Sequence, residues 1–217
     1  MRRNAIIILG VVLAALLLGR TSLGGADQTA LSLDAHTPHA IRVDRAGARV
    51  YWRIDQVEVH HSDAVRTRDN RLGSRLIITA PNVTVFMEAG LVLDGTTSAE
   101  PAISGSAEAK GLHVVGGTNG AAPKLRGYSG AIHGPQAHLV TVSRLSIEHC
   151  DGPGLVLGND AIVKDVRVDR ASGDGIALGR LSRAERVVVR SVRGRGISLG
   201  DRGYVGSSDV SGLASEG

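Results

Sequence analysis

The chain has 217 residues with 29 glycines, and only 2% of its side chains are aromatic, which argues against a compact globular core packed around large rings. Its net charge of +4 comes almost wholly from arginine, because lysine occurs only at positions 110, 124 and 164. This basic balance reflects either coding bias or a surface suited to acidic polymers such as uronate polysaccharide, lipopolysaccharide or nucleic acid. Nucleic acid is disfavoured, since single-strand binders interleave their cations with aromatic side chains for base stacking.

The first 26 residues have the pattern of a signal peptide. A basic head with Arg2 and Arg3 precedes an uncharged apolar stretch over residues 5–19, and residues 24–26 are small, as a cleavage site requires. The sequence therefore predicts a secreted or periplasmic protein. The apolar stretch is shorter than the roughly 20 residues of a membrane-spanning helix. The alternative is an uncleaved N-terminal segment, which would be the only membrane contact.

Residues 27–73 are predicted to hold a few strands and an irregular N-terminal cap. Apolar and polar residues alternate around residues 41–43 and 57–59, as in strands with one buried face, and residues 60–72 are rich in charge. A stack of repeats needs an atypical terminal unit to cover its open end. This region is the candidate for that unit.

Repeating units begin after this region, with short apolar runs separated by turn residues at 76–79, 83–85 and 91–93. Equivalent apolar pairs are spaced more widely here than later in the chain, which predicts insertions at residues 96–109 and 116–128. Loops inserted on one face of a stack commonly form its binding surface. We therefore expect these two segments to shape any site.

The C-terminal third repeats with a step of 21 residues. The run Gly154-Leu155-Val156-Leu157-Gly158 recurs as Gly175-Ile176-Ala177-Leu178-Gly179 and as Gly196-Ile197-Ser198-Leu199-Gly200. Such a strand-and-turn unit is too short for two helices, and it buries its apolar face only by stacking on its neighbours. The repeat therefore predicts an all-β stack. These side chains are predicted to point inward: Leu155, Leu157, Val166, Val168, Ile176, Leu178, Val187, Val189, Ile197 and Leu199.

One further step from Gly196 reaches Gly217, the last residue, so the chain stops as a new coil opens. We therefore expect residues 74–217 to be a stack truncated at its C-terminal end, in a fragment of a longer protein. The only cysteine, Cys150, excludes an internal disulfide. It is expected to be a small packed residue rather than a nucleophile.

Three strands per unit, a step near 21 and turns of the form Gly-Asp-Gly-Ile-Ala-Leu-Gly at residues 173–179 together resemble the right-handed parallel β-helix of the pectin-lyase-like superfamily. The resemblance covers residues 74–217 and implies a right-handed parallel β-helix solenoid that follows the signal segment and the N-terminal cap. Members of that superfamily include lyases, hydrolases, epimerases, tailspikes and adhesins. The resemblance therefore implies the fold and leaves the activity open.

Two turns also resemble those of the polygalacturonases, which carry an aspartate pair in a Gly-Asp-Asp turn and a histidine in a Gly-His-Gly turn one coil later. Asp174 matches the second aspartate, whereas Gly173 stands at the first and Arg195 at the histidine. One coil earlier, the family's aspartate falls on Gly152, next to Asp151. Hydrolysis of a glycosidic bond needs two carboxylates in different protonation roles. The comparison therefore implies that this chain is not an active polygalacturonase.

Residues 21 apart in such a stack lie above one another, about 4.8 Å apart, so the repeat predicts columns of charge. Opposite charges alternate in three of them, which we expect to stabilise the stack by roughly 0.2–1 kcal/mol per pair. The three columns are Arg144, Asp165 and Arg186; Lys164 and Glu185; and Asp174, Arg195 and Glu216.

A fourth column places two carboxylates together, because Glu148 stacks on Asp169 and Asp169 on Arg190. Adjacent carboxylates repel and raise the pKa of at least one of them unless a cation intervenes. On a functional interpretation, Ca²⁺ would suit these oxygens; lyases of the superfamily use it with a basic residue, here Arg190, Lys164 or Arg167. On a structural interpretation, both carboxylates face solvent and Arg190 compensates them. The candidate catalytic residues are Asp174, Asp169 and Glu148, and no cofactor other than Ca²⁺ is expected.

Polyanion binding is expected on the arginine-rich coil over residues 180–202. The candidate binding residues are Arg180, Arg183, Arg190, Arg193, Arg195 and Arg202, of which Arg180, Arg183, Arg193 and Arg202 are predicted to be least compensated. Two hypotheses remain. One is an exported protein that binds or processes an acidic polysaccharide as a lyase, hydrolase or epimerase. The other is a non-catalytic exported rod, adhesin or passenger domain, which needs only neutralised columns and no convergent groove.

Overall fold

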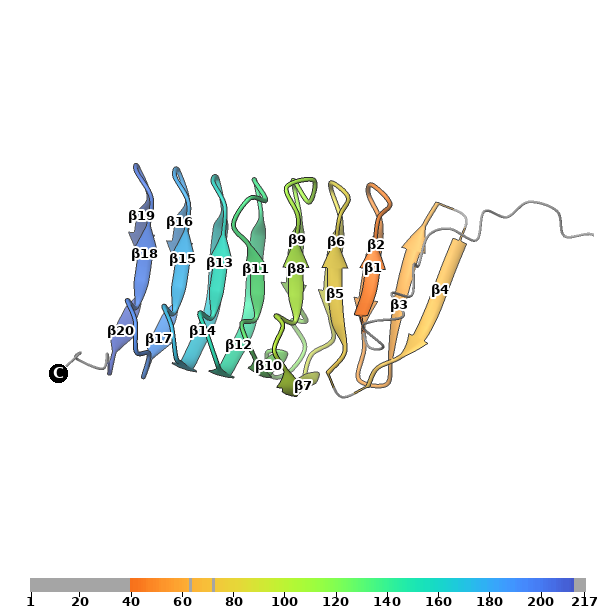
Figure 1. The fold of residues 1–217 in the computed structure, drawn as a ribbon, viewed down its shortest axis with the longest axis horizontal. Helices are drawn as coiled ribbons and strands as arrows, with labels where there is room; N and C mark the ends of the chain where they lie inside the picture. Colours follow the sequence, from red (N-terminus) through yellow and green to blue (C-terminus); the bar gives the residue numbers. More distant parts are fainter. Residues whose placement is uncertain (1–39, 63, 72, 213–217) are drawn as a thin grey trace, which may run out of the picture.

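The computed structural model describes residues 40–62, 64–71 and 73–212, so the predicted signal segment and the start of the predicted cap lie outside the described residues. Within these ranges the chain is all-β, as predicted, and no helix is present that could cross a membrane. The strands follow one another along a single long axis (Figure 1).

One sheet, sheet A, is wholly parallel, and each of its strands pairs with the equivalent strand of the next coil. In spatial order its described strands are β1 (Ala40–Val43), β5 (Arg75–Ile78), β8 (Ile103–Gly105), β11 (Ile132–Gly134), β13 (Leu155–Leu157), β15 (Ile176–Leu178) and β18 (Ile197–Leu199). Leu155 pairs with Ile176, and Ile176 pairs with Ile197. This register confirms the predicted step of 21 residues.

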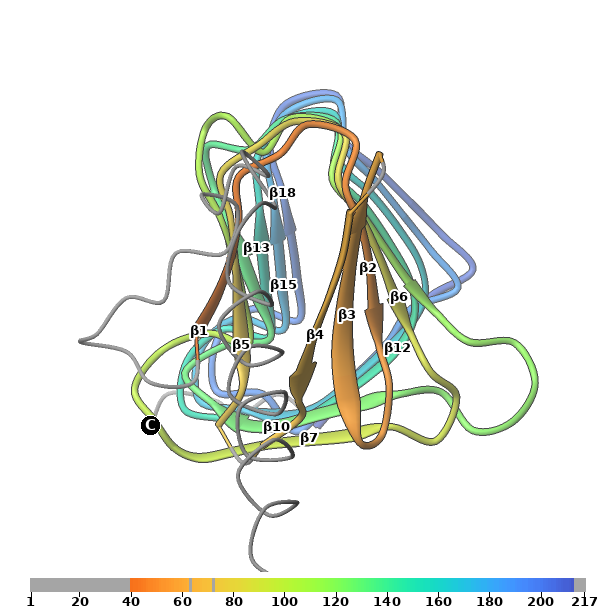
Figure 2. The ribbon, with the colours of Figure 1, turned by 90° about the vertical axis from the view of Figure 1, so that its right-hand side faces the viewer.

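The second sheet, sheet B, bends into two arms, because its long strands β12 (Thr141–Cys150) and β14 (Ile162–Ala171) each pair with two shorter strands of a neighbouring coil. The first arm also contains β2 (Arg49–Trp52), β6 (Thr84–Met87), β9 (His113–Gly116), β16 (Arg183–Glu185) and β19 (Tyr204–Gly206). The second arm also contains β7 (Val92–Ser98), β10 (Lys124–Tyr128), β17 (Val188–Arg190) and β20 (Asp209–Ser211). Seen along the long axis, sheet A and the two arms surround one interior (Figure 2), an arrangement compatible with a β-helix-like solenoid.

Three columns of backbone corners join these walls, and each column recurs every 21 residues. At every corner a residue has a φ between 49° and 62°, the left-handed region that turns the chain sharply and disfavours most L side chains. The columns are Leu139, Asp160, Leu181 and Arg202; Arg144, Asp165, Arg186 and Ser207; and His149, Arg170, Ser191 and Gly212. The first column continues toward the N-terminus through Gly111, Asn82 and Gly47.

The interior is filled mainly by columns of Val, Ile, Leu and Ala. Of the ten side chains predicted to point inward, eight are buried, which confirms the predicted pattern. Ile197 and Leu199 are only partly buried and pack against the core from one side, because among the described strands β18 pairs with β15 alone. Tyr128 is buried as well, and its hydroxyl donates a hydrogen bond of 2.7 Å to the carbonyl of Ser74.

The N-terminal end of the stack is antiparallel. β3 (Gln56–His61) pairs with β2, and β4 (Ala64–Asp69) pairs with β3, both in antiparallel register. β1 and β2 themselves pair in parallel with β5 and β6. The parallel ladder therefore reaches back into the region that was expected to form the cap, and β3 and β4 form the end of sheet B (Figure 1).

The two predicted insertions are only partly loops. Residues 96–109 include β8, which pairs with β5, and residues 116–128 include β10, which pairs with β7 and β12. The connections from β7 to β8 and from β9 to β10 extend beyond the common outline of the coils (Figure 2). The first of these connections contributes to a pocket described below.

Candidate functional site

The connections that lead from the second arm of sheet B to sheet A stack on one another and form what we call the turn edge. The turn edge comprises residues 99–102, 129–131, 151–154, 172–175 and 191–196. Backbone hydrogen bonds join each turn to the next. The amide of Gly154 donates to the carbonyl of Asp174, and the amide of Gly175 donates to that of Arg195, both at 2.9 Å.

Glycines make this close stacking sterically feasible. A Cβ atom on Gly173 would lie 2.8 Å from the amide nitrogen of Pro153, and one on Gly194 would lie 2.8 Å from that of Asp174. Such contacts are too short for a real side chain, so the turns would have to move apart. Gly173 stands where polygalacturonases have an aspartate. The turn edge therefore leaves no room for that second carboxylate beside Asp174.

Asp174 joins two coils through both of its carboxylate oxygens. The amide of Arg195 donates to Oδ1 at 2.8 Å, and the guanidinium of Arg195 donates to Oδ2 at 3.0 Å. This geometry agrees with the predicted column of Asp174 and Arg195, whose third member, Glu216, lies outside the described residues. The contacts orient the carboxylate toward the neighbouring turn.

Glu148 and Asp169 are paired in the parallel register of β12 and β14, as predicted. Cations intervene between them and their surroundings. Lys124 Nζ lies 2.9 Å from Glu148 Oε1, while Arg167 and Arg170 lie 3.7 and 3.8 Å from the carboxylate of Asp169. The hydrogen bond and the charge of Lys124 hold the pKa of Glu148 below its ordinary value.

Arg190 was expected to compensate this carboxylate pair. It lies beside Asp169 in the register of β14 and β17, but its guanidinium pairs with Asp209 at 3.1 Å. The expected role of Arg190 is therefore wrong, and Lys124 and Arg167 take that role. No contact within the described ranges joins Asp174 to Glu148 or Asp169, so the three candidate catalytic carboxylates do not converge.

The predicted arginine set is also divided. Arg183 lies 2.8 Å from Glu185 and stacks over the ring of Tyr204, and Arg180 lies 3.7 Å from Asp201. The prediction that these two are uncompensated is wrong, because carboxylates at the next positions of the corner were overlooked. Arg193 and Arg202 make no ion pair with any described residue.

An open groove of about 600 Å³ lies along the turn edge, beside the corner column of His149, Arg170 and Ser191. Its lining residues are His149, Cys150, Asp151, Arg170, Ala171, Ser172, Ser191 and Arg193. Most of them are members of columns with the 21-residue step. The left-handed corners direct the chain outward on successive coils, so side chains of the same kind of position line one groove.

The groove combines cationic side chains with hydroxyl groups. His149, Arg170 and Arg193 are exposed, and Ser172 and Ser191 lie between them, whereas the buried Cys150 forms part of the floor. Burial raises the pKa of the Cys150 thiol to about 12, so it remains protonated at neutral pH, in agreement with a packed residue. Such a lining suits an anion with several oxygen atoms.

Sequence reasoning found only Arg193 in this groove. His149 and Arg170 were missed because nothing in the sequence marks their left-handed corners. The signal that could have found them is the 21-residue step itself, which relates position 149 to 170 and position 151 to 172 and 193.

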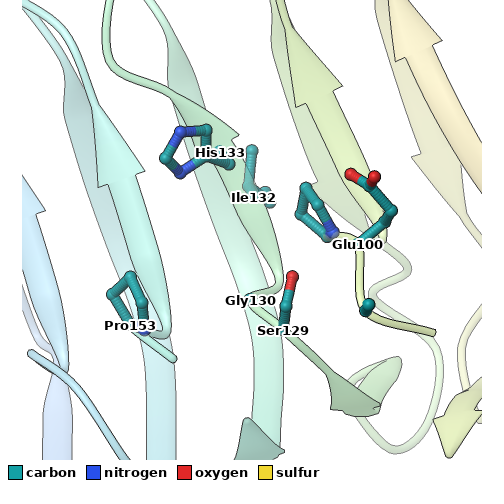
Figure 3. Close-up of a pocket in the computed structure, with 8 residues that line it drawn as sticks. Glu100, Ser129, Gly130, Ile132, His133 and Pro153 are labelled. Atoms are coloured by element: carbon teal, nitrogen blue, oxygen red, sulfur yellow. The ribbon is translucent and has the colours of Figure 1, made fainter. Parts of the chain in front are cut away.

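A second, smaller depression on the turn edge, of about 310 Å³, lies beside β11 and is called here the β11 pocket (Figure 3). It is lined by Ala99, Glu100, Pro101, Ser129, Gly130, Ile132, His133 and Pro153. Glu100 lies 3.3 Å from the largely buried guanidinium of Arg75. The pocket and the groove share one turn, since Pro153 lines the pocket and Asp151 lines the groove.

Over the described ranges, no group of three or more His, Cys, Asp or Glu side chains is placed to hold a metal ion. The suggested Ca²⁺ ion therefore remains a prediction. The fold and the turn edge define the class only as an all-β protein of stacked parallel strands with a cationic groove. No family model matches the chain, and neither a curated protein nor a solved structure gives a significant match.

Proposed function

We propose that this chain is an exported right-handed parallel β-helix that binds an acidic polysaccharide along its turn edge without cleaving it. The parallel ladder with its 21-residue register and three corner columns supports the solenoid. The basic head and apolar stretch of the first 26 residues support export, to the periplasm or the medium.

The observation that carries the binding proposal is the groove that contains Arg170 and Arg193. The two arginines come from successive coils, whose strands are about 4.8 Å apart. Arg193 has no ion pair among the described residues, and Arg170 makes only a long one of 3.8 Å to Asp169. Both guanidinium groups can therefore pair with carboxylates of an extended polyanion, with His149 and the serine hydroxyls as further donors.

The arrangement of the carboxylates favours binding over cleavage. Glycoside hydrolysis needs one carboxylic acid and one carboxylate facing the same bond. Glu148 is paired with Lys124, Asp169 lies between two arginines, and Asp174 accepts two hydrogen bonds from Arg195. Each of these groups is stabilised in its ionised form, and no carboxylate is held as a proton donor near another.

The test compares binding of polygalacturonate and of alginate to the parent and to two double variants with equal net charge. Arg170→Ser/Arg193→Ser removes the groove cations, and Arg180→Ser/Arg183→Ser removes two arginines at another corner. We expect the groove variant to bind about tenfold or more weakly and the control within about twofold, because only the groove pairs are lost. Binding should weaken with added salt.

The same samples are assayed for new reducing ends and for unsaturated products. Cleavage by the parent would replace the binding proposal with a processing enzyme. Equal losses in the two double variants would show that net charge alone acts, and no binding by the parent would favour the rod or adhesin. Any of these three results overturns the proposal.

A further inference from the structure

The β11 pocket continues the groove along the turn edge. Residues 151–154 form one short turn, in which Asp151 faces the groove and Pro153 faces the pocket. A polysaccharide that lies in the groove and follows the turn edge toward β11 therefore reaches the pocket next. The pocket is about half the volume of the groove, 310 against 600 Å³. It is at the small end of ligand sites, which suits a single sugar ring.

The pocket offers no cation to a carboxylate. The charge of Glu100 is compensated by Arg75, whose side chain is only 10% exposed and is held within the wall of the stack. No lysine or arginine is among the lining residues. A uronate placed here would lose hydration without gaining an ion pair, and it would approach the carboxylate of Glu100.

The walls of the pocket suit an uncharged sugar. Pro101, Pro153 and Ile132 present apolar surface, which can pack against the C–H face of a pyranose ring. The Ser129 hydroxyl and the imidazole of His133 lie at the rim (Figure 3), where they can donate to or accept from sugar hydroxyl groups. Few polar groups at fixed positions on an apolar wall are typical of a selective site.

We propose that the β11 pocket is a subsite for a neutral sugar, so that the bound polysaccharide carries uronates interspersed with uncharged sugars. This inference rests on the proposed binding of an acidic polysaccharide. It names the class of polysaccharide: a heteropolymer, in which the groove pairs with the carboxylates and the pocket holds a neutral ring.

The test uses hexasaccharides that alternate glucuronate with glucose or with N-acetylglucosamine, and an all-uronate hexamer of galacturonate. His133→Ala removes a hydrogen-bonding group from the rim, and Ala99→Phe fills the pocket from an exposed position. His138→Ala is the matched control, since His138 is an exposed histidine that lines neither depression. Thermal unfolding of each variant verifies that it is folded.

We expect both pocket variants to bind at least one alternating ligand about fivefold more weakly and the all-uronate hexamer within about twofold, as for one or two lost hydrogen bonds. His138→Ala should bind like the parent. The inference is overturned if the pocket variants bind the alternating ligands normally, or if they lose all three ligands equally. In those cases the groove variant still tests the proposed function separately, and a parent that binds none of the ligands overturns both.

Discussion

Asp174 bridges two coils, and its contacts allow its role to be tested at the scale of one residue. Replacing Asp174 by alanine should lower the free energy of unfolding by about 1–2 kcal/mol, because the buried side of the turn loses an acceptor. Asp174→Asn should cost less than half as much, since an amide oxygen can accept from the Arg195 amide. Asn159 already does so for the amide of Arg180, at 2.9 Å. Urea unfolding measures both; equal losses would contradict this role.

Glu148 should make stability depend on pH. Lys124 holds the pKa of Glu148 below its ordinary value of 4.5. A carboxylate with a lowered folded-state pKa stabilises the protein above the unfolded-state pKa, and that contribution is lost as the pH falls through the folded-state pKa. Between about pH 5 and pH 3, the free energy of unfolding of the parent should fall more steeply than that of Glu148→Gln.

The control for this pH dependence is Asp201→Asn, which removes a largely exposed carboxylate. Its unfolding curve should follow the parent at every pH. If Glu148→Gln also follows the parent, the ion pair with Lys124 contributes nothing measurable, as for many exposed pairs.

At the scale of turns and strands, the corner columns are the least expected feature. Gly47, Asn82, Gly111 and Asp160 suit the left-handed region, whereas Leu181 does not, although it has a φ of 55°. Leu181 is half exposed, so its burial contributes little. Leu181→Asn should raise the free energy of unfolding by about 0.5–1 kcal/mol, because asparagine adopts this backbone conformation more readily.

Leu181→Ala separates the backbone effect from the loss of the side chain. Alanine keeps a Cβ atom and therefore keeps the strain, so this variant should be no more stable than the parent. Equal urea midpoints for the asparagine and alanine variants would show that the corner is not strained.

The register of the strands could be predicted from the sequence because Gly154, Gly175 and Gly196 have equal spacing and because each is followed by an apolar alternation. The groove could not, since it depends on the direction of the chain after His149 and Arg170. Those residues have no intrinsic preference for a left-handed corner, and stacking on neighbouring coils imposes it. Pairings such as Arg190 with Asp209 were missed because side chains can reach along a strand as well as across it.

At the scale of the whole molecule, a stack in which each coil contacts only its neighbours should lose stability locally. Val168, Val189 and Val210 occupy one column, but the first two are fully buried and Val210 is 41% exposed. Val168→Ala should lower the free energy of unfolding by about 2 kcal/mol, and Val210→Ala by under about 0.5 kcal/mol. Similar losses at both positions would show that the last described coil is covered in solution.

The three corner columns also bear on how such a chain changes length. Because every position in the regular region is equivalent to the one 21 residues away, a tandem duplication of any 21 residues there restores all three corners, wherever it starts. A duplication of 20 or 22 residues would turn inward-facing side chains outward. Gain or loss of genetic material is thus tolerated in whole coils, and each added coil would lengthen the turn edge by one more set of binding positions.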